Sequence, residues 1–386
     1  TFPLLVFSHA SCGMPQMYYE AAEDLARHGY VVAAPAHLGN SMLDTLTSSS
    51  LTYCISKGAQ ATNYTFANSL GNALWRPKDL SAVADKLTIS SLLDSATDQP
   101  WLASLVDTHF YFGVVGHSFG GTAALQIMNA KTPTCNEVFD EFPMHAVRNE
   151  EYKETFCSDE SLKSYKRNEN GQFLLYDKRF KAAVALDAAV FPNPKNRSSS
   201  YTDMHYPILF MNNGAAEGST SGNYRFYEAN KYRFKAIHEH NSEAKLAIMR
   251  IVNSEHMSFT SACKLPQDVR ELLNLIPTAH CSAKSAAITE VTNYFSSYWF
   301  SWHLLHIKQA MYAFDPEIMD YKYQSLISSL ESYNVLELRE SRTSIIVASV
   351  TTAVFFILFL AGVVIFVAAL FALQRAQGLY ERLTQS

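Results

Sequence analysis

The stretch Tyr111-Phe-Gly-Val-Val-Gly116-His-Ser118-Phe-Gly120-Gly121 is an apolar run that turns, through glycines, into a helix-like segment at residues 119–129. Its centre matches the pattern G-x-S-x-G, in which a serine occupies a sharp turn between a strand and a helix. A side chain at Gly116 or Gly120 would collide with the neighbouring backbone, so the turn requires both glycines. We therefore predict that Ser118 projects from the carboxyl edge of a sheet as a nucleophile, at the positive end of the helix.

Short apolar runs and helical patterns alternate on both sides of this turn. Strands are predicted at residues 2–8, 30–34, 111–115, 182–186, 208–211 and 246–252, and helices at residues 15–27, 78–87, 119–129 and 287–307. Strands that alternate with helices form a mostly parallel sheet with helices on both faces, so the fold class is α/β. Residues 39–74 are interpreted as loop. The charged, irregular segment at about 132–180 is predicted to be an insertion, either a lid or a decorated loop.

Two downstream residues fit the partners that a nucleophilic serine needs. A serine hydroxyl requires an imidazole to accept its proton and a carboxylate to fix the tautomer of that imidazole. Asp187 directly follows the predicted strand at 182–186, and His256 follows the strand at 246–252 after a short turn. Because the carboxyl ends of parallel strands share one edge, we expect both side chains to lie beside Ser118, in the chain order Ser, Asp, His.

Other acidic and histidine residues fit these roles less well. Asp177 and Asp203 lie in polar segments before strands, and His238 and His240 precede the last predicted strand, which puts all four at the opposite edge. His117 lies inside the turn itself and is expected to pack or hydrogen-bond locally.

The negative charge that develops on the reacting carbonyl oxygen needs two backbone N–H donors. One is predicted to be the amide of Phe119, the residue after the nucleophile. The other should come from the loop after the first strand, at residues 9–13, where Ser11 is the candidate. The alternative is that this loop is an ordinary turn whose amides face water.

Charge and hydropathy separate the end of the chain from the rest. The chain has 386 residues and a net charge of −5, without a long basic run, which argues against a nucleic-acid partner. Residues 345–373 contain no charge and can cross a hydrocarbon layer of roughly 30 Å, so a single transmembrane helix is predicted there. Arg339 and Arg342 precede this segment and Arg375 and Arg382 follow it, so charge does not set its orientation.

These patterns divide the chain into four predicted parts. They are a catalytic domain at residues 1–310, a membrane-proximal connector at 311–344, the transmembrane helix at 345–373 and a short tail at 374–386. The chain starts at Thr1, without Met, directly before a strand-like run, and no signal peptide is visible. Further N-terminal strands are therefore expected upstream.

The cysteines and two short motifs bear on the compartment. Six cysteines are present, and none forms a CxxC pair, which argues against a zinc site. An even number suits disulfides, and the preferred pairs bracket short segments: Cys135 with Cys157, and Cys263 with Cys281. Sequence alone does not fix this connectivity. Asn63-Tyr-Thr and Asn196-Arg-Ser are glycosylation sequons, so a lumenal or extracellular catalytic domain is favoured.

Several stretches together resemble the platelet-activating-factor acetylhydrolases of the plasma and type II kind, a family of α/β-hydrolases. The stretches are Leu4-Leu-Val-Phe-Ser-His9, Asp24-Leu-Ala-Arg-His-Gly29, Tyr30-Val-Val-Ala-Ala34, Gly116-His-Ser-Phe-Gly-Gly121, and Ala185-Leu-Asp-Ala188 with Phe191-Pro192. The resemblance implies a calcium-independent phospholipase that removes a short or oxidised acyl group from the sn-2 position of a glycerophospholipid. It assigns the triad and the oxyanion-hole amides to the following residues: Ser118, Asp187, His256, Ser11 and Phe119.

The leading interpretation is ester hydrolysis through an acyl-serine, without a cofactor, on a phospholipid or lipid ester near a membrane. Within the enzyme class, the alternative is a broad carboxylesterase or a triacylglycerol lipase. Outside it, the alternative is a non-catalytic adhesion protein that uses a hydrolase fold and one membrane helix. The presence of all three triad residue types favours an enzyme. The sequence leaves the acyl-chain length, the organelle and the oligomeric state open.

Overall fold

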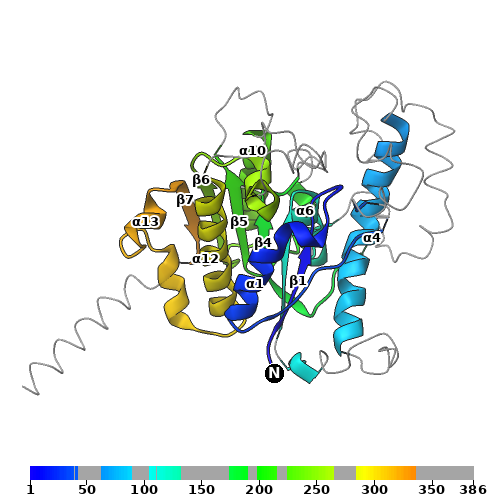
Figure 1. Cartoon of the computed structure of the whole chain (residues 1–386), viewed down its shortest axis with the longest axis horizontal. Coiled ribbons are helices and arrows are strands. Elements are labelled where there is room, and N and C mark those ends of the chain that lie inside the picture. Colours follow the sequence, from blue (N-terminus) through cyan, green and yellow to red (C-terminus); the bar gives the residue numbers. More distant parts are fainter. Residues whose placement is uncertain are drawn as a thin grey trace, which may run out of the picture. The chain divides into compact units, whose positions relative to one another are not determined.

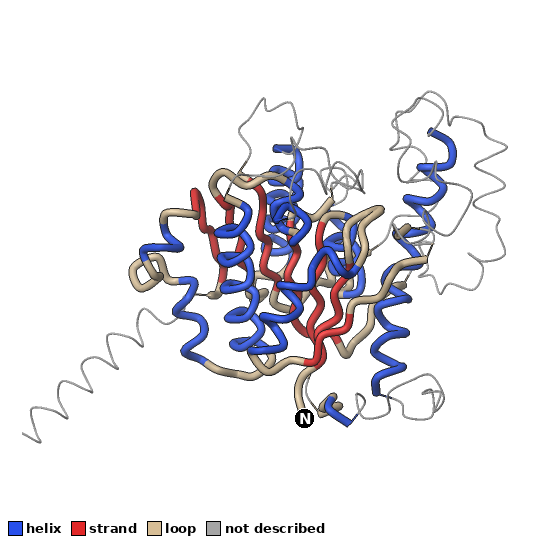
Figure 2. The backbone as a smooth tube through the Cα atoms, viewed as in Figure 1, coloured by secondary structure: helices blue, strands red, loops and turns tan. Residues whose placement is uncertain are grey.

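The structure is a computed structural model in which two compact units are distinguished, Thr1–Val335 and Leu336–Ser386. The described residues are 1–38, 40–41, 62–88, 104–109, 111–131, 174–189, 198–214, 224–264 and 284–335, all within the first unit. The backbone of this unit is a sheet enclosed by helices (Figures 1 and 2).

Strands and helices alternate along the described chain, as the apolar runs predict. The strands are β1 (Leu4–Ser8), β2 (Val31–Ala33), β3 (Phe112–His117), β4 (Phe180–Leu186), β5 (Ile208–Asn213), β6 (Leu246–Ile251) and β7 (Ile327–Tyr333). The helices are α1 (Tyr19–Arg27), α4 (Thr62–Thr88), α6 (Phe119–Ile127), α10 (Tyr224–His240), α12 (Ser285–His303) and α13 (Tyr321–Gln324). Short 3-10 helices are η1 (Pro15–Tyr18), η5 (Ser198–Tyr201), η6 (His256–Phe259), η7 (Ser261–Lys264) and η9 (Lys308–Phe314).

All seven strands form one sheet in the order β2-β1-β3-β4-β5-β6-β7. The first six strands in this order run parallel, and β7 is antiparallel to β6. The carboxyl ends of β1, β3, β4, β5 and β6 therefore meet at one edge, which is the edge at which polar strand-end residues gather. The predicted mostly parallel sheet covered by helices is confirmed.

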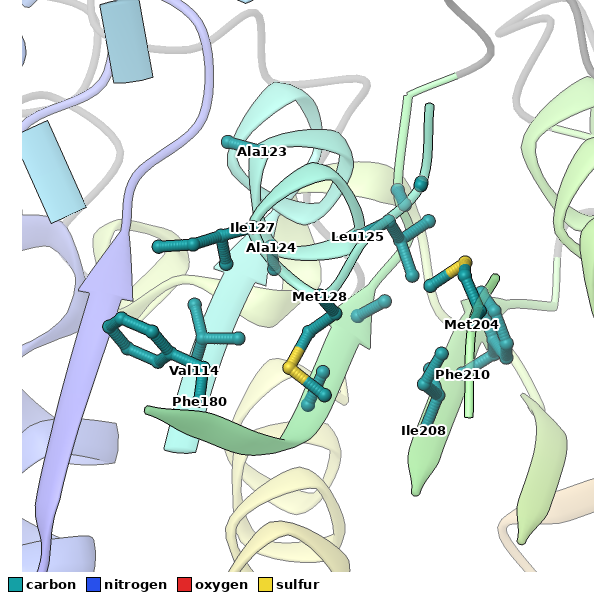
Figure 3. Packing of buried hydrophobic residues seen from close by; sticks show 14 of the residues in the cluster. Val114, Ala123, Ala124, Leu125, Ile127, Met128, Phe180, Met204, Ile208 and Phe210 are labelled. Carbon is teal, nitrogen blue, oxygen red and sulfur yellow. The ribbon is translucent and has the colours of Figure 1, made fainter. Parts of the chain in front are cut away.

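Helices cover both faces of the sheet (Figure 1). On one face, α1 packs against α12, and α12 lies on the central strands. On the other face, α4, α6 and α10 share one apolar core with alternate residues of the strands. Figure 3 shows this core around α6, where Leu125 and Met128 face Val114, Phe180 and Phe210 of the sheet. Every residue of α6 is buried, so the helix that starts at the serine turn is fixed by packing on all sides.

Two elements differ from the sequence-based prediction. The loop expected at residues 39–74 ends earlier, because α4 begins at Thr62 and continues through Pro77. Leu74 and Leu80 are both fully buried on either side of that proline. Burial of this helix face outweighs the one backbone hydrogen bond that proline cannot donate.

The second difference concerns the end of the catalytic domain, which the sequence put at residue 310. The compact unit continues to Val335, because β7 pairs with β6 as the last strand of the sheet. The proposed connector at 311–344 therefore contains the end of η9 and the whole of α13 and β7. An antiparallel edge strand with one polar face, Ile327-Ser-Ser-Leu-Glu-Ser-Tyr333, lacks the continuous apolar run that revealed the parallel strands.

Several predictions fall on residues beyond those described. Among the helices that the structure describes, none combines the length and apolarity needed to span a bilayer. The predicted transmembrane segment at 345–373 and most of the insertion at 132–180 lie outside the described residues. Cys12 and Cys263 are both disulfide-bonded. The predicted pairs are not tested, because they involve residues outside the described part: Cys135, Cys157 and Cys281.

Candidate active site

Ser118 occupies a strained turn between β3 and α6. Its backbone has φ 56° and ψ −119°, a region that non-glycine residues rarely adopt, and its side chain is nearly buried. A Cβ added at Gly116 would overlap the carbonyl group of Gly120, and one added at Gly120 would overlap the carbonyl of Ser8. The two glycines thus allow three backbone segments to approach closely, and the serine is left at the tip of the turn.

Asp187 and His256 meet at the same edge of the sheet. Asp187 follows the last residue of β4 and is fully buried, while His256 starts η6 after β6. The Nδ1 atom of His256 lies 2.5 Å from the Oδ2 atom of Asp187. The carboxylate accepts a hydrogen bond from the Nδ1–H group, which leaves Nε2 of the imidazole free to act as a base.

A residue that the sequence analysis did not select completes the surroundings of this carboxylate. Asn213, at the end of β5, donates its side-chain amide to both carboxylate oxygens of Asp187 at 2.8 Å. Its backbone N–H also lies 3.2 Å from Oδ1. The available sequence signal was the polar pair Asn212-Asn213 directly after the apolar residues of β5. These donors stabilise the negative charge of a buried carboxylate.

Backbone hydrogen bonds connect the serine turn to the residues on both sides of Asp187. The amide of Ser118 donates to the carbonyl of Leu186 at 2.9 Å, and the amide of Ala189 donates to the carbonyl of Ser118 at 2.8 Å. The chain on both sides of Asp187 is therefore fixed to the nucleophile. The ring of His256 is stacked on Phe226, with ring centroids 4.5 Å apart. The structure thus places His256 in contact with Asp187 and the backbone of Ser118 beside Asp187.

The loop after β1, at residues 9–13, lies against the start of α6 through the close approach of Gly120. Three of its amides have acceptors within the protein: Ala10 donates to the Tyr18 hydroxyl, Cys12 to the Asn40 carbonyl and Gly13 to the Ala10 carbonyl. In this described loop the amide of Ser11 has no such acceptor, and the residue is exposed. A donor without an acceptor in the protein is one condition of the predicted oxyanion role.

A buried arginine supports this loop from below. Arg76, in α4, is fully buried and donates to the backbone carbonyls of His9 and Ala10 and to the Asn40 side chain. Its guanidinium also lies over the ring of Phe119, 5.2 Å from the ring centroid. One cation thereby contacts the loop carbonyls and the residue that follows the nucleophile. Nothing in the local sequence around Arg76 indicates this role.

A second serine–histidine–aspartate arrangement lies beneath the same loop. Ser8 Oγ is 2.8 Å from His37 Nε2, and His37 Nδ1 is 2.7 Å from Asp79 Oδ2. Ser8 and His37 are fully buried, so no substrate can reach the Ser8 hydroxyl. Here the arrangement supports the loop, because the backbone N–H of His37 donates to His9 Nε2 at 3.1 Å.

Burial keeps the histidines under the loop neutral. Burial, with the positive charge of Arg76 as the next cause, lowers the pKa of His37 to about 2. The pKa of His9 is also lowered to about 2, again mainly by burial. Burial raises the pKa of the Asp79 carboxyl to about 6, and the charge of Arg76 opposes this shift.

The alternative aspartates and histidines for the triad form contacts away from Ser118. Asp177 forms an ion pair with Arg179 at 2.5 Å, and Asp203 forms one with Lys131 at 3.1 Å. His238 stacks on a ring of β7, and His240 ends α10. Both aspartates precede their strands, at the edge opposite Ser118, as the sequence order predicts.

The remaining predicted sites lie largely beyond the described residues. The side chain of Asn63 and the whole of Asn196 are outside them, so neither sequon is tested. Within the described ranges, no group of three or more histidine, cysteine, aspartate or glutamate residues is placed to hold a metal ion.

A family model supports the resemblance found in the sequence. The family model for platelet-activating factor acetylhydrolase, isoform II, matches residues 1–63, which include β1 and the loop after it. A ferulic acid esterase from Streptomyces cinnamoneus is 21% identical with a TM-score of 0.44, over 79% of this chain and 68% of that chain. The thioesterase domain from the curacin biosynthetic pathway is 14% identical with a TM-score of 0.30, over 71% of this chain and 91% of that chain.

Proposed function

We propose that this protein is a serine-dependent carboxylic ester hydrolase that works through an acyl-enzyme. The observation that carries the proposal is the 2.5 Å contact between His256 and the buried Asp187, at the sheet edge where Ser118 occupies its strained turn. A buried carboxylate that orients an imidazole beside a strained serine is the arrangement that nucleophilic acyl transfer requires.

The first half of the reaction forms the acyl-enzyme. Nε2 of His256 takes the proton of Ser118 as Oγ bonds to the ester carbonyl carbon, and the carbonyl oxygen becomes an oxyanion. The amides of Ser11 and Phe119 donate hydrogen bonds to that oxyanion. When the tetrahedral intermediate collapses, the bond to the alcohol oxygen breaks and His256 delivers its proton to the leaving alcohol.

The second half regenerates the serine. Nε2 of His256 removes a proton from water while the water oxygen bonds to the acyl carbon. The bond from that carbon to Ser118 Oγ then breaks, and the proton returns to Oγ. Asp187 remains ionised throughout and stabilises the transient imidazolium.

For the substrate, we propose the sn-2 acetyl or short oxidised acyl group of a glycerophospholipid such as platelet-activating factor. The family match over residues 1–63 supports this choice, because it includes the loop at residues 9–13, here called the oxyanion loop. A broader carboxylesterase or triacylglycerol lipase would hydrolyse long acyl chains equally well. Rates on sn-2 acetyl and sn-2 long-chain phosphatidylcholine therefore separate these specificities, and equal rates would contradict the acetylhydrolase proposal.

We further propose that residues 345–373 anchor the protein in a membrane with the catalytic domain outside the cytosol. The uncharged run and the disulfide bonding of Cys12 and Cys263 support this topology. Glycans on Asn63 or Asn196 of the full chain, detected by glycosidase shift, are the expected result. Protease added to cells whose plasma membrane alone is permeabilised reaches only cytosolic domains. Digestion of the catalytic domain under that condition, and not in intact cells, would contradict this topology.

A fluorophosphonate probe tests the nucleophile directly, because it reacts with activated serines and leaves a covalent phosphonyl adduct. We expect labelling of the wild type, loss of labelling in Ser118→Ala and retained labelling in Ser8→Ala, because the probe cannot reach the buried hydroxyl of Ser8. Mass spectrometry should locate the adduct on the peptide that contains Ser118. Labelling that survives Ser118→Ala would refute the assignment, and an unlabelled wild type would favour the non-catalytic alternative.

A further inference from the structure

A chain of buried hydrogen bonds joins the oxyanion loop to the loop of the catalytic histidine. The amide of Ala10 donates to the hydroxyl of Tyr18 at 3.0 Å, and that hydroxyl lies 2.8 Å from Nδ1 of His117. On the other side of the same imidazole, Nε2 of His117 lies 2.9 Å from the backbone carbonyl of His256. Tyr18 and His117 are both buried, so water does not compete for these bonds.

The chemistry of these groups fixes the direction of every bond in the chain. A carbonyl oxygen only accepts, so Nε2 of His117 must carry the proton that it shares with His256. Burial lowers the pKa of His117 well below its ordinary value, so the ring is neutral and its Nδ1 accepts. Tyr18 must then donate its proton to Nδ1 while its oxygen accepts from Ala10. No group in the chain is left without a partner.

The position of the two loops explains why such a connection matters. The oxyanion loop follows β1, which neighbours β3, whereas His256 follows β6, three strands away from β3 in the sheet. The loop of His256 must therefore extend back across β4 and β5 to the serine. Asp187 holds the imidazole, and His117, the residue before the nucleophile, holds the backbone of the same residue. The rings of His117 and His256 are also in contact, with centroids 4.7 Å apart and planes tilted by 38°.

We propose that Tyr18 and His117 are positioning residues that set the oxyanion loop and the catalytic histidine in one common geometry. This inference rests on the proposed hydrolase function and deepens it, because neither residue touches the substrate. Two hydrogen bonds must shorten in the transition state: the one from the loop amide to the oxyanion, and the one between Nε2 of His256 and Ser118. One buried connection then controls the position of both. Loss of that connection is expected to lower kcat more than it raises KM, since small displacements weaken transition-state contacts first.

Tyr18→Phe tests the proposal with the smallest change. It removes one hydroxyl and keeps the ring that packs on Phe7, whose centroid is 4.6 Å away. The matched control is Tyr30→Phe, because Tyr30 is also buried and, among the described residues, its hydroxyl bonds only Ser301, at 3.2 Å, away from the site. Hydrolysis of a short-chain p-nitrophenyl ester gives kcat and KM, and denaturant unfolding shows whether each variant is folded.

We expect Tyr18→Phe to lower kcat by about tenfold with KM changed by less than about threefold, while Tyr30→Phe keeps the wild-type kcat. His117→Gln serves as a second variant and should also lower kcat. The double variant should lose little more than the larger single effect, because both changes break the same connection. A wild-type kcat in folded Tyr18→Phe, or strictly multiplicative losses in the double variant, would overturn the proposal.

The same experiment separates this inference from the function on which it rests. If the wild type neither hydrolyses the ester nor reacts with the fluorophosphonate, the proposed function is wrong. If the wild type reacts and Tyr18→Phe reacts at the same rate, only the positioning role is wrong.

Discussion

Replacement of the buried His37 by glutamine is predicted to cost more stability at pH 7 than at pH 5. In the folded protein the pKa of His37 is lowered to about 2 by burial and by the charge of Arg76, from an ordinary value of 6.5. At any pH between these two pKa values, the histidine binds a proton in the unfolded chain but not in the folded chain. The wild type therefore loses stability as the pH falls below 6.5, while a glutamine at this position does not titrate.

The size of this stability difference follows from the lowered pKa of His37 and depends little on how far that pKa is lowered. At pH 5 the unfolded histidine lies 1.5 pH units below its ordinary pKa of 6.5, which corresponds to about 2 kcal/mol. Any folded pKa below about 4 gives the same figure, because the folded histidine is then unprotonated at pH 5. The destabilisation caused by His37→Gln should therefore be about 2 kcal/mol smaller at pH 5 than at pH 7. The raised pKa of Asp79 acts in the opposite direction, but it is present in both proteins and largely cancels.

Urea unfolding of the wild type and of His37→Gln at both pH values measures this difference. The fluorescence of the buried Trp299 reports on the catalytic unit. His109→Gln, at an exposed histidine, is the control and should change stability little at either pH. Equal destabilisation by His37→Gln at pH 7 and pH 5, within about 0.5 kcal/mol, would refute the view that a neutral buried histidine supports the oxyanion loop.

Three further substitutions probe the site. Asn213→Ala removes the side-chain donor to both oxygens of the Asp187 carboxylate and should lower the free energy of unfolding by about 2 kcal/mol in urea titration; a loss below about 0.5 kcal/mol would contradict the contact. Gly120→Ala places a methyl group against a strand carbonyl and should abolish fluorophosphonate labelling, whereas normal labelling would argue against the tight turn. Arg76→Lys keeps the positive charge but loses the paired N–H donors to the carbonyls of the oxyanion loop. The kcat of ester hydrolysis by the folded variant should therefore fall roughly tenfold or more. An unchanged kcat would exclude a role for the guanidinium geometry.

The parallel strands and the three chemical residues could be located from the sequence because each has a local signal. A buried strand is a short apolar run, and the polar residue directly after it lies at the carboxyl edge of a parallel sheet. This rule placed Asp187 after β4 and His256 after β6, and the structure brings them to 2.5 Å. The glycines around Ser118 gave the turn by sterics alone. Apolar runs and turn glycines are properties of a few neighbouring residues, so they can be recognised without knowledge of any tertiary contact.

The groups that position this chemistry were decided only by the tertiary structure. Arg76 and His37 support the oxyanion loop, Asn213 holds the carboxylate, and Tyr18 with His117 connects two loops. These residues are far apart in the chain, and except for His117 in the serine turn they belong to no motif, because a buried polar group needs a partner in space and not a neighbour in sequence. Ser8, His37 and Asp79 form a second serine–histidine–aspartate set of contacts, but its serine and histidine are fully buried, whereas His256 is partly exposed. Sequence determined which residues can react, and packing determined which of them can be reached.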